Sequence, residues 1–274
     1  MVEPLKAPIF AGIDVGSLTA EALLLDADAR VLGGVIIRVR PRVEQSAREA
    51  LGKALAETGL REEQIDLCFS TGYGRESIPF TKKNISEISC HGRGAHHLEP
   101  SIRTVIDVGG QDCKIVRLDA DGNLEDFAMN DKCAAGTGRF LEMMARTLSV
   151  DISELGPLAL QSKKPLLLSS QCTIFSEMEV MQLLYSGKKK SDIAAGVHAT
   201  LVRRIKTLAG RVGLREQVCV TGGGCKNLGL LAALERELGL DFRKLPFDPQ
   251  LVGALGAALF ARDAWKAARL RAQP

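Results

Sequence analysis

The sequence carries one strand–turn–strand unit twice, and this internal repeat constrains the fold more than any single motif does. In each copy an apolar run ends in an aspartate, a glycine turn follows, and a second apolar run ends in another aspartate. The equivalent pairs, separated by a constant offset, are Asp14 and Asp107, Gly16 and Gly109, and Asp26 and Asp119. Because expected helices alternate with the strands, we predict an α/β fold built from two halves.

Each glycine turn has a use in nucleotide binding. Glycine lets backbone N–H groups approach phosphate oxygens, and an aspartate at the strand end can hold Mg²⁺ directly or through water. A third glycine-rich turn, residues 221–227, follows an apolar strand and suits the nucleoside end of ATP or ADP. One such turn alone is more often a simple tight turn, whereas three in this order predict a nucleotide site. The candidate binding residues are Asp14, Gly16, Ser17, Thr19, Gly109, Gly110, Gly222, Gly223, Gly224 and Asn227.

Cys133 and Cys172 each stand one residue before an expected helix, of residues 134–148 and 173–186 respectively. The unpaired N–H groups and partial positive charge of a helix start stabilise a thiolate or a thiolate-bound cluster. A 4Fe-4S cluster takes about four thiolate ligands, so two cysteines per chain predict a cluster shared by two symmetry-related copies. That arrangement implies a homodimer and electron transfer.

The other five cysteines have different expectations. Without CxxC pairs or a secretion signal, a disulfide scaffold is disfavoured. Cys68, Cys113 and Cys219 fall in expected strands and are predicted to be buried as small apolar side chains. Cys90 and Cys225 are left open, although the spacing of Cys90 and its neighbouring histidines fits no standard zinc pattern.

Composition limits the class of protein. A chain of 274 residues with 46% hydrophobic content can bury a substantial core. A net charge of +3 and 4% aromatic residues do not favour nucleic-acid binding. No segment approaches the roughly 18 apolar residues that span a bilayer, and residues 1–8 contain no apolar signal core, so we expect a cytoplasmic protein. The lysines at 188–190 are interpreted as a solvated loop or a docking spot for an acidic partner.

We expect two subdomains. Residues 1–100 form the N-terminal ATPase subdomain, and residues 101–249 form the C-terminal one, which carries the cluster cysteines. A final helix of residues 250–267, rich in small side chains, is expected to pack back on the first subdomain. Further helices are predicted at 43–58, 85–98, 192–212 and 228–238.

The aspartate-glycine turns and the late Gly222–Gly224 turn resemble the actin, sugar kinase and heat-shock chaperone ATPase superfamily, whose fold places two subdomains around a nucleotide cleft. The cysteine segments resemble one branch, the activators (component A) of 2-hydroxyacyl-CoA dehydratases in the BadF/BadG/BcrA/BcrD-type ATPase family. That branch is similar to the ATP-hydrolysing subunits of benzoyl-CoA reductase. The similarity covers about residues 10–261 and is most specific at 70–75, 86–91, 106–112 and the two cysteine segments. The Gly-Gly-Gln-Asp sequence at 109–112 favours the dehydratase activators over the reductase subunits.

The resemblance implies a homodimer in which Cys133 and Cys172 of both subunits bind one 4Fe-4S cluster. Reduced ferredoxin or flavodoxin charges the cluster, ATP turnover moves the helices beside it, and one electron passes to a dehydratase or a related iron–sulfur reductase. For one electron, about 300 mV of extra driving force is roughly 7 kcal/mol, which explains the use of ATP. Asp107 is expected to organise Mg²⁺, with Gln111 or Asp112 orienting the attacking water. Gly136 and Thr137 join the nucleotide-binding candidates.

The sequence departs from the family pattern near the first turn. The family usually has a lysine where this chain has Glu21, whereas the second repeat keeps Lys114 at the equivalent position. An acid near phosphate is unfavourable, so either Glu21 points away or the nucleotide affinity is altered. In addition, Cys225, Lys226 and Met178 replace smaller or neutral residues.

Two other classes of function stay open. The first is a small-molecule kinase of the same fold, in which an aspartate acts as base on a hydroxyl. The second is a non-catalytic partner that nucleotide switches between shapes. The kinase leaves the two helix-start cysteines without a role, and iron content separates both alternatives from the electron activator. The final acceptor, and the choice between dehydratase and benzoyl-CoA reductase-type partners, cannot be named because the acceptor binds the partner protein.

Overall fold

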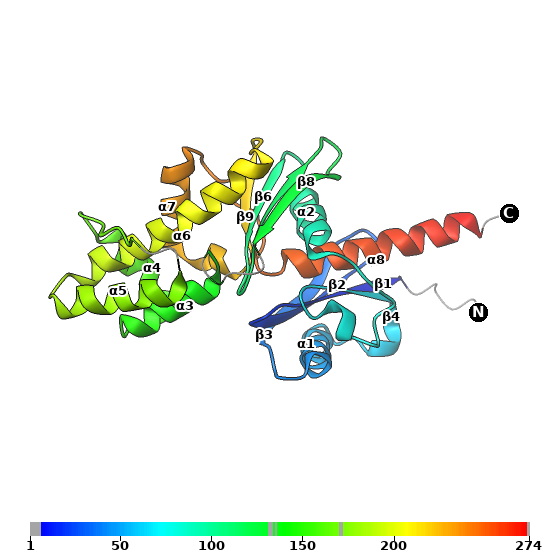
Figure 1. Cartoon of the computed structure of the whole chain (residues 1–274). Helices are drawn as coiled ribbons and strands as arrows, with labels where there is room; N and C mark the ends of the chain where they lie inside the picture. Colours follow the sequence, from blue (N-terminus) through cyan, green and yellow to red (C-terminus); the bar gives the residue numbers. More distant parts are fainter. Residues whose placement is uncertain (1–6, 131–133, 135, 170–171, 273–274) are drawn as a thin grey trace. The chain divides into compact units, whose positions relative to one another are not determined.

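The computed structural model describes residues 7–130, 134, 136–169 and 172–272. The chain divides into two compact units. Unit 1 comprises Met1–Pro100 and Leu245–Pro274, and unit 2 comprises Ser101–Lys244. Each unit contains one mixed β-sheet with helices (Figure 1), which confirms the predicted α/β fold.

Unit 1 is built on a sheet of order β3-β2-β1-β4-β5. Strands β1, β2 and β3 are antiparallel neighbours, and β4 lies parallel to β1. Its strands are β1 (Ile9–Val15), β2 (Thr19–Leu25), β3 (Val31–Arg38), β4 (Ile65–Thr71) and β5 (Lys83–Asn84). Its helices are α1 (Val43–Thr58), α2 (Glu87–Leu98) and α8 (Val252–Arg271), with short 3-10 turns η1 (Glu62–Gln64) and η2 (Arg75–Ser77).

Strand β1 is buried along its whole length, because helices cover both faces of the sheet. Ile13 and Val15 pack in one cluster with the alanines of α1, whereas Phe10 packs in another with α8. Gly12 lies on the α8 side, where a Cβ would come within 1.9 Å of the Ala254 carbonyl oxygen. The small residues of α8 therefore allow this helix to lie directly against the β1 backbone.

Unit 2 is built on a sheet of order β8-β7-β6-β9. Strand β7 pairs antiparallel with both β6 and β8, and β9 lies parallel to β6. Its strands are β6 (Thr104–Val108), β7 (Cys113–Leu118), β8 (Leu124–Asn130) and β9 (Val218–Thr221). Its helices are α3 (Gly138–Thr147), α4 (Ile152–Leu160), α5 (Thr173–Tyr185), α6 (Lys190–Val212) and α7 (Leu228–Leu238), with the 3-10 turn η3 (Gly223–Lys226) before α7.

The two sheets repeat the same register, which extends the duplication seen in the sequence. Asp14 pairs with Glu21 on β2 and with Thr71 on β4. Asp107 pairs in the same way with Lys114 on β7 and with Thr221 on β9. The turns after β2 and β7 are alike too, because the carboxylates of Asp26 and Asp119 each accept two backbone N–H groups of their own turn.

The expected helix of residues 134–148 is wrong at its start, because α3 begins at Gly138. Gly136 has φ of +108° and Thr137 is extended, so neither residue can belong to a right-handed helix. By contrast, α1 and α7 have their predicted bounds, and α5 starts where it was predicted. Strands β3 and β8 and helix α4, which contains Pro157, were not predicted.

Within the described part of the chain, no helix is both long and apolar enough to span a bilayer.

Candidate functional site

The first turn places Asp14 at the end of β1, where its side chain is buried. The amide of Gly16 donates to the carbonyl of Thr19 at 2.9 Å and closes the turn, with Ser17 inside it. The Nε2 atom of His91, from α2, lies 3.9 Å from Asp14 Oδ2. A Cβ on Gly253, in the first turn of α8, would lie 2.0 Å from the same oxygen. Glycine at this position therefore lets the start of α8 approach the Asp14 carboxylate.

Glu21 is the neighbour of Asp14 across the strand pair and is buried as well. Its Oε1 accepts from the side-chain amide of Gln250 at 3.1 Å, and the same amide donates to Thr19 Oγ1 at 2.9 Å. Gln250 precedes α8, so this amide connects the β2 end of the turn to the helix. Glu21 is thus held inside unit 1 by a neutral donor.

The second turn places two carboxylates around one buried lysine. Lys114 Nζ donates to Asp107 Oδ2 at 3.1 Å and to Asp112 Oδ1 at 2.7 Å. The amide of Gly109 donates to the Asp112 carbonyl at 3.0 Å and closes the turn, with Gly110 and Gln111 inside it. A Cβ on Gly109 would lie 2.3 Å from Asp112 Oδ1, so a side chain at this position would displace the Asp112 carboxylate.

The third turn supports Asp107 from β9. Thr221 Oγ1 donates to Asp107 Oδ1 at 3.0 Å, and a Cβ on Gly222, which has φ of +80°, would lie 2.6 Å from that oxygen. The equivalent of Gly222 in unit 1 is Gly72, where a Cβ would lie 2.2 Å from Asp14 Oδ1. Sequence reasoning missed Thr221 and Gly72 as site residues, although the recurrence of Thr-Gly-x-Gly at 71–74 and 221–224 was a signal that could have found them.

The side chain of Asn227 makes hydrogen bonds within unit 2. Its Oδ1 accepts from the Leu230 amide at 3.0 Å and caps α7, and it lies 3.0 Å from Nε2 of His198 on α6. Gly223 is exposed and Gly224 is buried in η3. The structure therefore places Asn227 at the joint between the third turn, α6 and α7.

Gly136 and Thr137 lie just before α3, next to the second turn. The amides of Gly138 and Arg139, the first two residues of α3, donate to the carbonyls of Gly109 and Gly110 at 2.9 and 2.8 Å. Thr137 is buried and its hydroxyl donates to the carbonyl of Ala134. Two hydrogen bonds thus join the backbone of the second turn to the start of α3.

Cys133 lies outside the described residues, whereas Cys172 is the residue before α5. Cys172 is exposed, and its carbonyl accepts from the Ser176 amide at 2.8 Å as the first hydrogen bond of the helix. Among the described residues, no three His, Cys, Asp or Glu side chains are grouped so that they could hold a metal ion. An exposed thiol at a helix start fits a cluster completed by a second chain, and it does not fit one enclosed by the described residues of a single chain.

The cysteines of strands β4, β7 and β9 and of helix α2 are poor candidates for thiolate ligands. Burial raises the pKa of the Cys68 thiol to about 12, and it also raises the pKa values of Cys90, Cys113 and Cys219. Cys113 and Cys219 are buried in β7 and β9 as predicted, whereas Cys68 in β4 is only partly buried. Because a ligand must be deprotonated, these raised pKa values disfavour the four thiols as metal ligands.

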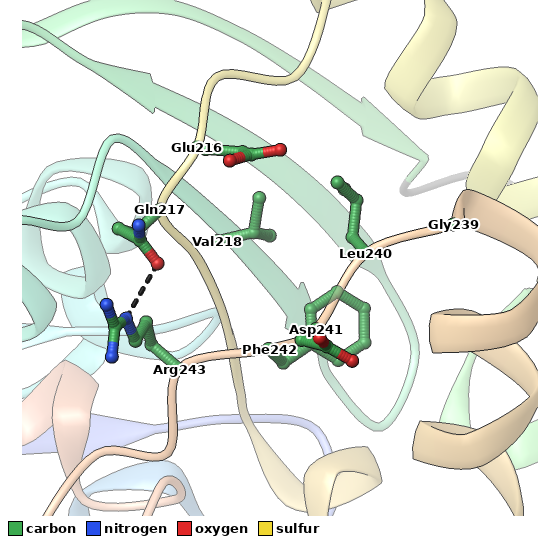
Figure 2. A pocket seen from close by; sticks show the side chains of 8 residues that line it. All are labelled: Glu216, Gln217, Val218, Gly239, Leu240, Asp241, Phe242 and Arg243. Carbon is green, nitrogen blue, oxygen red and sulfur yellow. Dashed lines mark hydrogen bonds between the residues drawn. The ribbon is translucent and has the colours of Figure 1, made fainter.

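A separate pocket of about 450 Å³ lies at the opposite end of β9 (Figure 2). Its wall combines carboxylates of Glu216 and Asp241 with the Arg243 guanidinium, whose Nε donates to Gln217 Oε1 at 2.6 Å. None of the predicted site residues lines this pocket. Its position at the start of β9 separates it from the Thr221 end of the strand.

Comparisons with known proteins agree with this arrangement. The sequence profile of the BadF/BadG/BcrA/BcrD ATPase family matches residues 11–261. A 2-hydroxyisocaproyl-CoA dehydratase activator of Clostridioides difficile is 42% identical over 92% of this chain and 94% of its own length. An activator of lactoyl-CoA dehydratase of Anaerotignum propionicum is 44% identical over 92% of this chain and 97% of its own.

The solved structure of an activator of the 2-hydroxyisocaproyl-CoA dehydratase from Clostridium difficile with bound ADPNP superimposes with a TM-score of 0.91. It is 40% identical, and the match covers 96% of this chain and 97% of that one. A sugar kinase, the ROK family glucokinase of Streptomyces griseus, shares the fold with a TM-score of 0.54 at 14% identity over 93% of this chain and 99% of its own. The predicted sugar-kinase-like fold is thereby confirmed.

Proposed function

Since this chain belongs to the BadF/BadG/BcrA/BcrD ATPase family, we propose that it is an ATP-hydrolysing iron–sulfur activator, which delivers one low-potential electron at a time to a 2-hydroxyacyl-CoA dehydratase or a related iron–sulfur reductase. The observation that carries the proposal is an exposed cysteine at the start of α5 in a chain that also has two aspartate-glycine turns of equal register. A kinase needs the turns and has no use for this cysteine.

The two turns supply the chemistry that Mg·ATP requires. Because the amides of Gly16 and Gly109 close their own turns, phosphate contacts fall to the residues inside, among them Ser17 and Gly110. Asp14 and Asp107 end equivalent strands and organise Mg²⁺ and its waters. Gln111 or Asp112 orients the attacking water, and Gly222 to Gly224 with Gly136 and Thr137 complete the nucleotide site. A relative of this chain was solved with ADPNP, which supports this part of the proposal.

Cys133 and Cys172 of two copies would hold one 4Fe-4S cluster, which supplies one-electron transfer when it is bound. A homodimer is supported by the surface of α5 next to Cys172. The helix exposes a row of large apolar side chains, each between 39% and 90% exposed: Ile174, Phe175, Met178, Met181 and Tyr185. An apolar row of this kind marks a contact surface. In the dimer, a second copy would cover the end of this apolar row that lies next to Cys172.

The partners follow from the same chemistry. Reduced ferredoxin or flavodoxin would supply the electron, and a dehydratase would accept it. The relatives are named as activators of dehydratases, which supports a dehydratase as the partner. The residues of this chain would bind Mg·ATP and couple its hydrolysis to a movement of α3 and α5.

Iron content and oligomeric state test the proposal. Anaerobically purified protein should contain about four iron atoms per dimer. Cys172→Ala should lose the iron while the chain still binds ATP, and the matched Cys219→Ala, in β9, should keep it. Sedimentation should show a dimer of the wild-type protein. Iron-free wild-type protein that phosphorylates a small molecule would support the kinase instead.

The acceptor needs its own experiment. Reduced protein with Mg·ATP should activate a purified 2-hydroxyacyl-CoA dehydratase, and the same mixture with benzoyl-CoA reductase partner subunits tests the second acceptor class. Activation of the reductase alone would replace the dehydratase in the proposal. The Cys172→Ala protein serves as the inactive control in both assays.

A further inference from the structure

Lys114 is the centre of a buried charge network in unit 2. Only 1% of its surface is exposed, and its ammonium contacts the carboxylates of Asp107 and Asp112 at 3.1 and 2.7 Å. Both contacts are within hydrogen-bonding distance, and hydrogen bonds between charged groups are the strong ones. A buried ammonium keeps its charge only with such partners, so the three side chains depend on one another.

The two carboxylates are not equivalent. Asp107 uses Oδ1 for the Thr221 hydroxyl and Oδ2 for Lys114, and its side chain is 3% exposed. The Asp112 side chain is 16% exposed and lies at the end of the glycine turn. Asp107 therefore holds the lysine from inside the sheet, and Asp112 is the more exposed of the two carboxylates, at the end of the turn.

The first repeat lacks this arrangement. The position of Lys114 is taken there by Glu21, and the position of Asp112 is taken by Thr19. The two side chains are joined by the neutral amide of Gln250. The buried lysine that holds the Asp112 carboxylate beside the turn is thus a property of the second repeat.

We propose that Lys114 is a positioning residue for ATP hydrolysis: braced by Asp107, it holds the carboxylate of Asp112 in the orientation in which Asp112 acts on the attacking water or the cation. This inference rests on the proposed ATPase function and adds a residue to it. Lys114 is 1% exposed and is bonded to Asp107 and Asp112, so we place it behind the turn and not against the nucleotide. Preorganised groups of this kind require a fixed supporting shell.

Steady-state ATP hydrolysis by the anaerobically purified protein tests the inference. Lys114→Met should lower kcat by about 100-fold, the usual effect of a misplaced catalytic group, with KM for Mg·ATP changed by less than about threefold. The matched control is Lys206→Met, which breaks the exposed pair of Lys206 and Glu237 and should leave kcat unchanged. A tenfold or larger rise of KM at unchanged kcat would make Lys114 a phosphate contact and overturn the proposal.

A double-mutant cycle tests whether Lys114 acts through Asp112. If it does, Lys114→Met combined with Asp112→Asn should cost no more activity than the more severe single change. Losses that multiply would overturn the proposal. If Lys114→Met does not fold, Lys114→Gln replaces it, because its shorter neutral side chain keeps a polar group in the site but does not reach both carboxylates, and it should show the same loss of kcat. Wild-type kcat in folded Lys114→Gln would also overturn the proposal.

Amide hydrogen exchange separates this inference from the proposed function. The Gly109 amide closes the turn on the Asp112 carbonyl, so Lys114→Met should increase its exchange by at least about tenfold, while Gly16 in the first turn is unchanged. Wild-type protein without ATPase activity would defeat the proposed function, and the exchange rate at Gly109 would still decide the role of Lys114. An unchanged exchange rate of the Gly109 amide in Lys114→Met would overturn the proposal that Lys114 positions Asp112.

Discussion

His198 Nε2 lies 3.0 Å from Asn227 Oδ1, which ties the middle of α6 to the residue that caps α7 and ends the third glycine turn. The other ring nitrogen, Nδ1, lies 2.8 Å from the Ala194 carbonyl oxygen. His198 is 1% exposed, and burial lowers its pKa from the ordinary value of 6.5. The imidazole is therefore neutral in the folded protein near neutral pH.

This burial predicts a stability that depends on pH. Below pH 6.5 the unfolded chain binds a proton at His198 that the folded chain does not, so the free energy of unfolding is full above pH 6.5 and falls as the pH drops. The slope contributed by one proton is at most about 1.4 kcal/mol per pH unit. Urea unfolding at pH 7.5, 6.5 and 5.5 should show the fall, and His198→Gln should flatten it.

His97 provides the comparison, because its pKa is lowered by burial too but its ring is far less enclosed. His97→Gln should retain most of the pH dependence. An identical slope in wild-type protein and His198→Gln would mean that His198 is not the group that titrates.

Gly12 tests the packing of α8 on β1. A Cβ at this position would meet the Ala254 carbonyl oxygen at 1.9 Å and the Ala258 amide nitrogen at 2.5 Å. Gly12→Ala should lower the free energy of unfolding by at least about 2 kcal/mol, because overpacking moves the helix off the strand. Gly52 is exposed in α1 with nothing within 4 Å of its Cβ position, and Gly52→Ala should stabilise by about 0.5–1 kcal/mol. Equal effects of the two changes in urea unfolding would contradict the close approach.

Gly222 tests the support of Asp107. Gly222→Ala places a Cβ 2.6 Å from Asp107 Oδ1 and also 2.6 Å from the carbonyl oxygen of Val108, the residue after Asp107, and should lower kcat for ATP hydrolysis by about 10- to 100-fold. Gly213 has a similar φ of +75°, and its Cβ would meet only Arg117 at 3.6 Å. Gly213→Ala therefore carries comparable backbone strain and should keep wild-type kcat. A fall of kcat in both variants would assign the effect to strain and not to Asp107.

A path of contacts joins the second turn to the helix that follows Cys172. Gly138 donates to Gly109 at the start of α3, and Thr147 at its end donates to Glu177 Oε1, in the second turn of α5, at 3.2 Å. We predict that Mg²⁺ with a non-hydrolysable ATP analogue changes the rate at which a chelator removes iron, compared with ADP and with no nucleotide, because a ligand shifts a conformation that it binds unequally.

Gly138 offers a matched pair of variants for this coupling. Proline is tolerated at the first helical residue, and the extended Thr137 before it is compatible with proline, so Gly138→Pro removes the N–H donor to Gly109 while α3 can still form. The nucleotide effect on chelation should disappear in Gly138→Pro and persist in Gly138→Ala at equal iron content. Identical chelation rates in all nucleotide states of the wild-type protein would mean that nucleotide binding is not coupled to the cluster.

The sequence by itself was sufficient for features whose signal is local. Apolar periodicity and the positions of glycines within short segments were enough to predict the duplicated Asp-Val-Gly turns. The same local signals predicted the bounds of α1 and α7 and the start of α5. The family resemblance rested on such segments too, and the match over residues 11–261 confirms it. Local signals of this kind depend on neighbours a few residues apart, so no distant contact is needed to interpret them.

Only the tertiary structure decided how the polar side chains divide their work. Asn227 stays a predicted nucleotide-binding residue, and the structure adds that its Oδ1 caps α7 and contacts His198. The start of α3 moved to Gly138, where its amide meets the carbonyl of Gly109. Asp107 meets Thr221, 114 residues further along the chain. The physical reason is that a buried polar atom must find a partner wherever the fold supplies one, and residue order alone does not specify which distant strand or helix brings it.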